Sequence, residues 1–265
     1  QGCAPICFTN NSRRMRFTLR NIKLLIEYDG SRYDGWQRPA AGAKGMTVQE
    51  KLEEILCRMD GEKIEIIGAA RTEAGVHASG QVANFHSGTD MSFLEIKHYL
   101  NRFLPRDIAV RSVDGVPERF HASYLAKAFR YEYHISIGEV PSVFGRKYNY
   151  YSFKRPDVKR MREAAKYFVG EHDFAAFSEN KRMKKSTVRR VSEFDVYGDE
   201  EEVLISMTAD DFWPYMARIM AGTLLSVGRG EIEPAQIVQV IGEKDRTKAG
   251  ERLEARGLFL TDVYY

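Results

Sequence analysis

The residues best suited to chemistry lie in one short stretch, residues 71–78, which read Arg-Thr-Glu-Ala-Gly-Val-His-Ala. The stretch brings a cation, Arg71, and a carboxylate, Glu73, close to an imidazole, His77. An ionised carboxylate can act as a nucleophile or a base, and a nearby cation favours its charged form. Apolar runs on both sides predict a connection between two strands, where a rigid scaffold can hold reactive groups. A plain surface loop with a tight turn at Gly75 is the alternative.

Three further side chains could take part, but each also has a structural explanation. Arg218 lies among apolar residues of a predicted helix, so it is either a snorkelling side chain or a buried partner for a carboxylate. Tyr131 falls on the apolar side of a predicted strand, which favours a core tyrosine whose hydroxyl needs a partner. His77 and His121 are lone histidines, which are more often structural than catalytic. No metal-ligand spacing, Ser-His-Asp or Cys-His arrangement, or phosphate-binding glycine loop can be placed.

A basic cluster occupies residues 181–190, which carry six cations and no acid. Such a density of charge attracts phosphate groups, and the cluster begins with Lys181, Arg182, Lys184 and Lys185. The alternative is a solvated basic face without a ligand.

The composition is typical of a folded, soluble chain. Its 265 residues suggest one large domain or two ordinary ones, and 43% of them are hydrophobic. A net charge of +3 does not by itself indicate a nucleic-acid partner. Three cysteines favour a reducing compartment over a disulfide framework, and no apolar stretch is long enough to cross a membrane. Residues 1–14 do not resemble a signal peptide, so we expect a tag or a disordered extension.

The first half, residues 15–115, is expected to alternate strands and helices. Strands are predicted at 22–28, 62–67, 81–86 and 107–113, and capping boxes at Thr47 and Ser92 start two helices. The resulting order, strand-helix-strand-strand-helix-strand, is that of a ferredoxin-like unit.

The second half, residues 116–265, is expected to repeat that order. Strands are predicted at 128–137, 188–197, 202–209 and 258–264, and helices between Pro156 and Gly170, at 212–227 and after Pro234. The sequence therefore predicts an α+β protein whose two ferredoxin-like, or RRM-like, halves share an extended antiparallel sheet. A cleft between such halves is a preferred place for a ligand.

Thirteen short segments, in order along residues 20–265, together resemble the TruA family of tRNA pseudouridine synthases. They are residues 28–30, 35–37, 47–49, 71–78, 100–101, 104–105, 108–110, 120–122, 130–133, 170–174, 216–218, 227–230 and 257–258. Among them, 71–78 is similar to the RTDAGVHA catalytic motif and 130–133 to the RYxY strand.

The resemblance implies the pseudouridine synthase fold and a cytoplasmic homodimer that isomerises uridine in the tRNA anticodon stem-loop without cofactor or metal. It places Glu73 at the catalytic aspartate and Tyr131 against the target uracil, and it implies that Arg71 occupies the space of the displaced base or steers that base. It pairs Arg218 with the catalytic carboxylate. We also expect His77 and the basic cluster to contact the RNA.

The chain departs from the family at four places. Glu73 is one methylene longer than aspartate, and Ser123 stands where arginine is common. Residues 213–215, Trp-Pro-Tyr, replace a segment that usually contains asparagine, and residues 251–256 do not match. Because a shift of about 1 Å can slow a reaction about 10²-fold, a catalytically impaired RNA-binding protein on the same fold is an alternative. A protein-interaction module is a second one.

Overall fold

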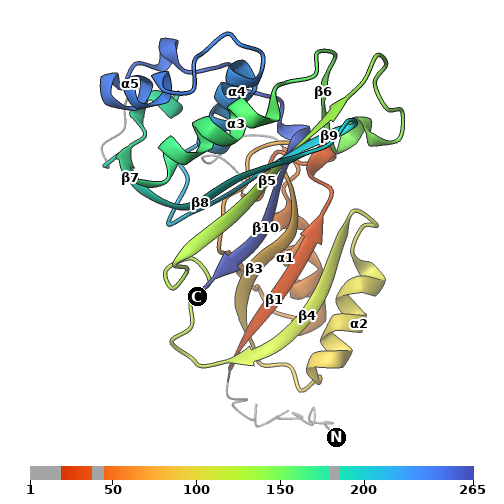
Figure 1. The fold of residues 1–265 in the computed structure, drawn as a ribbon. Helices are drawn as coiled ribbons and strands as arrows, with labels where there is room; N and C mark the ends of the chain where they lie inside the picture. Colours follow the sequence, from red (N-terminus) through yellow and green to blue (C-terminus); the bar gives the residue numbers. More distant parts are fainter. Residues whose placement is uncertain (1–18, 38–44, 180–185) are drawn as a thin grey trace, which may run out of the picture.

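One mixed sheet runs through the whole molecule (Figure 1). The computed structural model describes residues 19–37, 45–179 and 186–265, so the predicted extension at residues 1–14 lies outside the described residues. The strands follow the order β4-β1-β3-β10-β5-β9-β8-β7, with β2 paired to β3 and β6 paired to β5. No helix in the described ranges is long and apolar enough to span a membrane.

The first half has the predicted order of elements. They are β1 (Arg20–Tyr28), α1 (Val48–Asp60), β2 (Ile67–Gly68), β3 (His77–Ser87), α2 (Phe93–Phe103) and β4 (Ile108–Val116). Both predicted capping residues accept a hydrogen bond at the start of a helix: Thr47 from the amide of Glu50, and Ser92 from the amide of Glu95. The strand predicted at 62–67 is reduced to the two residues of β2.

The second half repeats the topology. Its elements are β5 (Ala128–Ile137), β6 (Tyr150–Ser152), α3 (Val158–Ala165), β7 (Gly170–Asp173), β8 (Val188–Gly198), β9 (Glu202–Ala209), α4 (Met216–Gly228), α5 (Gln236–Glu243) and β10 (Leu258–Tyr264). The order β10-β5-β9-β8 corresponds to β4-β1-β3-β2, so the prediction of two ferredoxin-like halves is confirmed. The short strands β6 and β7 were not predicted.

The C-terminal strand joins the two halves. β10 pairs parallel to β3, with Phe259 opposite His77 and Leu260 opposite Ala78. Its other edge pairs antiparallel to β5. Because β2 covers only the far part of the same β3 edge, the start of β3 is free to receive β10. The sheet is therefore shared, as predicted, but it is not antiparallel throughout, because β10 pairs parallel to β3. The division between residues 115 and 116 stays a prediction because no break in the sheet marks it.

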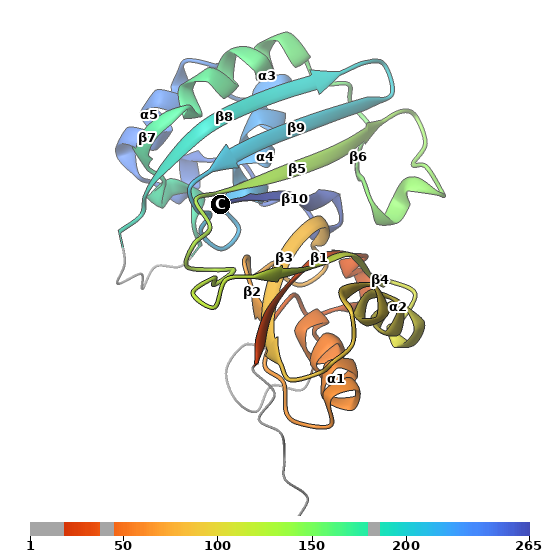
Figure 2. The ribbon, with the colours of Figure 1, turned by 90° about the horizontal axis from the view of Figure 1, so that it is seen from below.

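Helices cover each half of the sheet separately. Figure 2 shows α1 and α2 against the strands of the first half and α3, α4 and α5 against those of the second. In β5 the predicted alternation is present, with Phe129, Tyr131, Tyr133 and Ile135 buried. Every residue of α4 is buried except Arg218, as expected of a helix surrounded by other elements.

The start of α4 differs from the prediction. The apolar spacing predicts a helix from residue 212, but α4 begins at Met216. Pro214 disfavours helical geometry at the residue before it, and Tyr215 adopts a left-handed conformation with φ of 69°. These residues form a turn that borders the site described next.

Candidate active site

The loop that carries Glu73 is tied to β3 at its beginning. The Ala69 amide donates to the Val82 carbonyl at 2.8 Å. The buried Gln81 side chain accepts from the Ala70 amide at 3.2 Å and donates to the Ala70 carbonyl at 2.8 Å. The Gln81 side chain thus makes the two hydrogen bonds that the backbone of a neighbouring strand would make. These bonds fix the loop beyond the end of β2.

The other end of the loop is fixed by a turn. The Val76 amide donates to the Glu73 carbonyl at 3.1 Å, and Gly75 takes a positive φ of 78° that suits glycine. The Gly75 amide also donates to the Tyr33 carbonyl at 3.2 Å. The tight turn predicted at Gly75 is therefore present, and it holds the backbone of Glu73 rather than forming a free surface loop.

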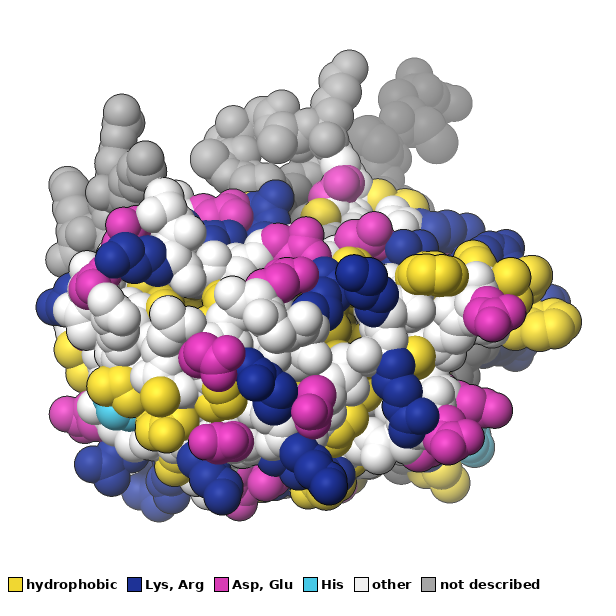
Figure 3. Space-filling model, turned by 45° about the horizontal axis from the view of Figure 1, so that its top comes forward, with side chains coloured by type: hydrophobic (Ala, Val, Ile, Leu, Met, Phe, Trp, Pro, Cys, Tyr) yellow, Lys and Arg dark blue, Asp and Glu magenta, His cyan; other side chains and the backbone are white. Residues whose placement is uncertain are grey.

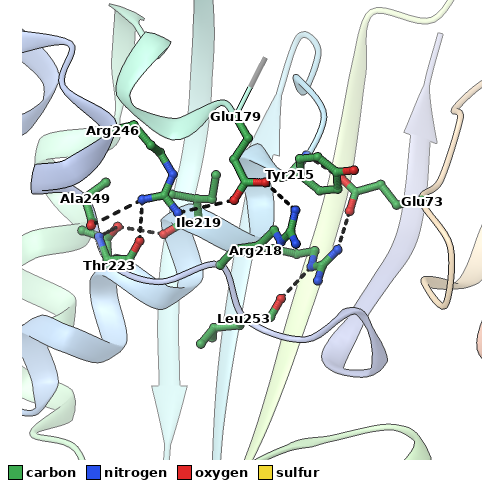
Figure 4. Close-up of polar contacts among 11 residues, drawn as sticks. Glu73, Glu179, Tyr215, Arg218, Ile219, Thr223, Arg246, Ala249 and Leu253 are labelled. Carbon is green, nitrogen blue, oxygen red and sulfur yellow. Dashed lines mark hydrogen bonds and ion pairs between the residues drawn. The ribbon is translucent and has the colours of Figure 1, made fainter. Parts of the chain in front are cut away.

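The Glu73 carboxylate is held by two groups from the second half (Figure 4). Arg218 Nη1 donates to Glu73 Oε2 at 2.7 Å, and the Tyr215 amide donates to Glu73 Oε1 at 2.5 Å. Arg218 is itself oriented, because its Nε donates to the Leu253 carbonyl at 2.7 Å. Only 11% of the Arg218 side chain and 21% of the Glu73 side chain are exposed. The charged hydrogen bonds are therefore partly shielded from solvent, where such bonds are strong.

The start of α4 adds a favourable field at the same place. Tyr215 is the residue that caps this helix, and its amide is the one that contacts Glu73. The positive end of the helix dipole favours a negative charge there. Arg218 was predicted as a partner of the carboxylate, whereas this backbone donor has no signature in residue type.

Glu73 lines a cavity of about 570 Å³ between the two halves. The first half also contributes Arg71 and Thr72, and the second half contributes Tyr131 and Phe212. The Tyr131 ring is buried and meets Phe212 edge-on, with 4.9 Å between ring centres. Burial and neighbouring negative groups, including Glu73, raise the pKa of Tyr131, so its phenol is neutral at physiological pH. The structure thus brings the predicted residues Arg71, Glu73, Tyr131 and Arg218 to one place.

Several cavity residues were not singled out as site residues. Arg189 was included only in the basic cluster, but it lines the cavity and packs its guanidinium 4.4 Å from the centre of the Trp213 ring. Its Nη2 also lies 3.1 Å from Asp211 Oδ2. Ser123 and Tyr124, from the connection between the halves, complete the rim. Arg189 lies between Val188 and Arg190, and no pattern in the sequence indicated that it faces inward.

His77 is not among the residues that line the cavity, and its contact with the RNA stays a prediction. The ring is fully buried and stacks on Phe259, with 4.7 Å between ring centres. Its Nδ1 accepts from the Gly30 amide and its Nε2 donates to the Lys147 carbonyl, both at 3.0 Å. Burial lowers the pKa of His77 despite nearby Asp29, so a neutral imidazole joins three segments of chain.

The remaining predicted contacts belong to the basic cluster. Lys181, Arg182, Lys184 and Lys185 lie outside the described residues. Within the described ranges, no three His, Cys, Asp or Glu side chains are grouped so that they could hold a metal ion.

The two ferredoxin-like halves, the shared sheet and the carboxylate–arginine pair beside a buried tyrosine define an α+β enzyme with the pseudouridine synthase fold. A family described as tRNA pseudouridine synthase matches residues 24–125 and 164–265. Together these matches cover more than half of the chain. The chain belongs to the TruA family of tRNA pseudouridine synthases.

Individual relatives agree over nearly the whole chain. The chain is 44% identical to tRNA pseudouridine synthase A of Bacillus sp. (strain KSM-64) over 247 residues, which cover 93% of this chain and 100% of that protein. It is 42% identical to tRNA pseudouridine synthase A 2 of Bacillus anthracis with the same coverage. The identity to tRNA pseudouridine synthase A of Clostridium kluyveri is 39%, again with the same coverage.

Proposed function

We propose that this enzyme isomerises uridine to pseudouridine in tRNA and that the Glu73 carboxylate is the reacting group. The observation that carries the proposal is the Glu73–Arg218 pair, joined at 2.7 Å in the wall of a cavity between the halves. The reaction breaks the bond from N1 of uracil to C1′ of the ribose, turns the base, and joins C5 to C1′. C5 then loses its proton to a base or to water, and N1 takes up a proton, so the product is an isomer of the substrate. A fixed carboxylate can act as the nucleophile or base in this sequence.

The cavity supports each requirement of that reaction. A uridine must leave its stack to be reached, at a cost of a few kcal/mol. The cavity volume of about 570 Å³ lies within the usual range of ligand sites. Tyr131 offers an aromatic surface for the uracil, and Arg218 keeps a positive charge against Glu73. Arg71 is exposed and lines the cavity, which supports a role in filling the space that the flipped base leaves.

Stacking on Tyr131 predicts a large difference between two substitutions at that residue. Tyr131→Ala is expected to lower kcat/KM about 5- to 150-fold, because base–aromatic stacking contributes about 1–3 kcal/mol. Tyr131→Phe keeps the ring and should retain activity within about fivefold of wild type. The measurement is tritium release from tRNA that contains 5-labelled uridine, with the melting temperature of each variant as a control for folding. Equal losses in both variants would contradict stacking as the main role.

We further propose that the RNA is the anticodon stem-loop and that its phosphates meet the basic cluster. The sequence resemblance supports the first proposal, and the six cations of residues 181–190 support the second. Figure 3 shows Lys and Arg interspersed with Asp and Glu over the described part of one face, and the net charge is only +3. A local cluster, rather than a uniform field, would therefore orient the RNA. The resemblance also supports a homodimer, and the free Cys57 fits a reducing cytoplasm.

The function is tested by incubating the purified protein with unmodified tRNA that contains 5-labelled uridine. We expect stoichiometric tritium release, pseudouridine in the anticodon stem-loop, and restoration of pseudouridine in cells that lack their own enzyme. Salt-sensitive tRNA binding without tritium release would instead identify a silent RNA-binding protein. Release accompanied by pseudouridine only outside the anticodon stem-loop would keep the activity and overturn the proposed site on the RNA.

A further inference from the structure

Tyr215 has an unusual backbone for its residue type. Its φ of 69° lies in the left-handed region, which only Tyr215 and Lys244 occupy among the described non-glycine residues. Side chains other than glycine and asparagine disfavour this region because Cβ approaches the following carbonyl. Lys244 ends a helix, where such a conformation is common, but Tyr215 begins one. The left-handed conformation is therefore energetically unfavourable at the start of α4, and other contacts must stabilise it.

The backbone of Tyr215 is fixed on its helical side. Its carbonyl accepts from the Ile219 amide at 2.9 Å and so belongs to the first turn of α4. A rotation about φ at residue 215 would turn its N–H away while the helix stayed in place. The 2.5 Å hydrogen bond to Glu73 Oε1 therefore depends on the left-handed conformation.

The Tyr215 ring is held by two guanidinium groups (Figure 4). Arg252 lies 4.4 Å from the ring centre and Arg218 lies 5.7 Å from it. Arg252 is in turn held by Glu179, with 2.5 Å between Nη1 and Oε2. Glu179 also faces Arg246, whose Nη1 donates to the Gly250 carbonyl at 2.9 Å. Contacts between a cation and an aromatic ring are attractive, so this chain of groups keeps the ring in place.

We propose that Tyr215 is a positioning residue for Glu73, whose ring, packed on Arg252 and Arg218, holds residue 215 in the conformation that directs its amide to the carboxylate. This inference rests on the proposed catalytic role of Glu73. Arg218 alone holds one oxygen of the carboxylate, and the Tyr215 amide holds the other. Two donors fix the orientation of the carboxylate plane, which one donor leaves free to rotate. Tyr215 thereby sets the position of the Glu73 carboxylate, whose side chain is one methylene longer than the aspartate of the family.

Three substitutions at Tyr215 separate positioning from packing. Tyr215→Phe keeps the ring and should leave kcat within about twofold of wild type. Tyr215→Asn removes the ring but tolerates the left-handed region, and we expect kcat within about fivefold of wild type. Tyr215→Leu introduces an apolar side chain that is larger than asparagine but disfavours the left-handed region. We expect it to lose about 10- to 100-fold in kcat with KM changed less than about threefold, because the carboxylate is misplaced.

A packing role predicts the reverse order, since leucine replaces more of the apolar volume of tyrosine than asparagine does. Tyr215→Leu with kcat equal to or above that of Tyr215→Asn would therefore overturn the proposal. Glu73→Gln in the same assay separates the two proposals: if it is as active as wild type, the catalytic role of Glu73 fails. If it is inactive but the Leu and Asn variants are equally active, only the positioning role of Tyr215 fails.

The amide proton of residue 215, followed by NMR, gives a readout that does not need turnover. A short hydrogen bond to a carboxylate is expected to shift this proton downfield, and Glu73→Gln should reduce the shift because a neutral amide oxygen is a weaker acceptor. Tyr215→Asn should keep most of the shift, and Tyr215→Leu should lose it. If the amide resonance of residue 215 moved in neither Glu73→Gln nor Tyr215→Leu, the proposal would be overturned. This test applies even if the protein has no activity.

Discussion

Replacing Glu73 by glutamine is expected to reduce kcat for pseudouridine formation by about 10³-fold or more, in line with the loss of a reacting group. Glutamine has nearly the same shape, so its oxygen can still accept from the Tyr215 amide, but the negative charge is gone. Its amide nitrogen would then face Arg218, and the two cannot form a hydrogen bond because both groups only donate. Single-turnover tritium release from 5-labelled tRNA measures the effect, and the Kd for tRNA should change less than about threefold.

Glu73→Asp is the matched control, because it keeps the charge and shortens the side chain by one methylene. The Tyr215 amide and Arg218 are placed for a glutamate at 2.5 Å and 2.7 Å. We therefore expect the aspartate variant to be slower than wild type by up to about 10²-fold, yet faster than the glutamine variant. If the aspartate variant formed pseudouridine and the wild-type protein did not, Glu73 would be shown to disable this site.

Removing Arg218 should affect both activity and stability. Arg218→Met is expected to reduce kcat about 10²-fold and to lower the free energy of unfolding by about 1–3 kcal/mol, because a partly buried carboxylate loses its charged donor. The Leu253 carbonyl would lose its 2.7 Å donor at the same time. Kinetics and chemical denaturation of the same samples measure the two effects.

Two further variants separate activity from stability at this pair. Arg218→Lys keeps the charge but cannot reproduce both directed hydrogen bonds of the guanidinium, so we expect partial activity. The double variant Glu73→Gln, Arg218→Met leaves no unpaired charge and should be more stable than the two single losses added together, yet inactive. Strictly additive losses of stability would show that the two side chains do not stabilise each other in solution.

Sequence patterns were informative where the information is local. Alternation of polar and apolar residues predicts β5 with its observed bounds, because successive side chains of a strand face opposite sides. The capping residues Thr47 and Ser92 mark the starts of α1 and α2 because their side chains bond the next residues of the same chain. Local patterning failed for α4, where a turn at Tyr215 replaces the first part of the predicted helix.

Residue patterns alone were enough to predict two repeated α+β halves and a loop that holds Glu73 beside a turn at Gly75. The resemblance to a known family supplied Arg218 as the partner of Glu73, and the structure shows that contact at 2.7 Å. The burial of His77, the inward direction of Arg189 and the hydrogen bond from the Tyr215 amide to Glu73 became visible only in the folded chain. These contacts join residues far apart in the chain, and they depend on the pairing of β10 with β3 and β5. Periodicity and caps report only neighbours in sequence, so no local pattern could reveal which distant groups meet.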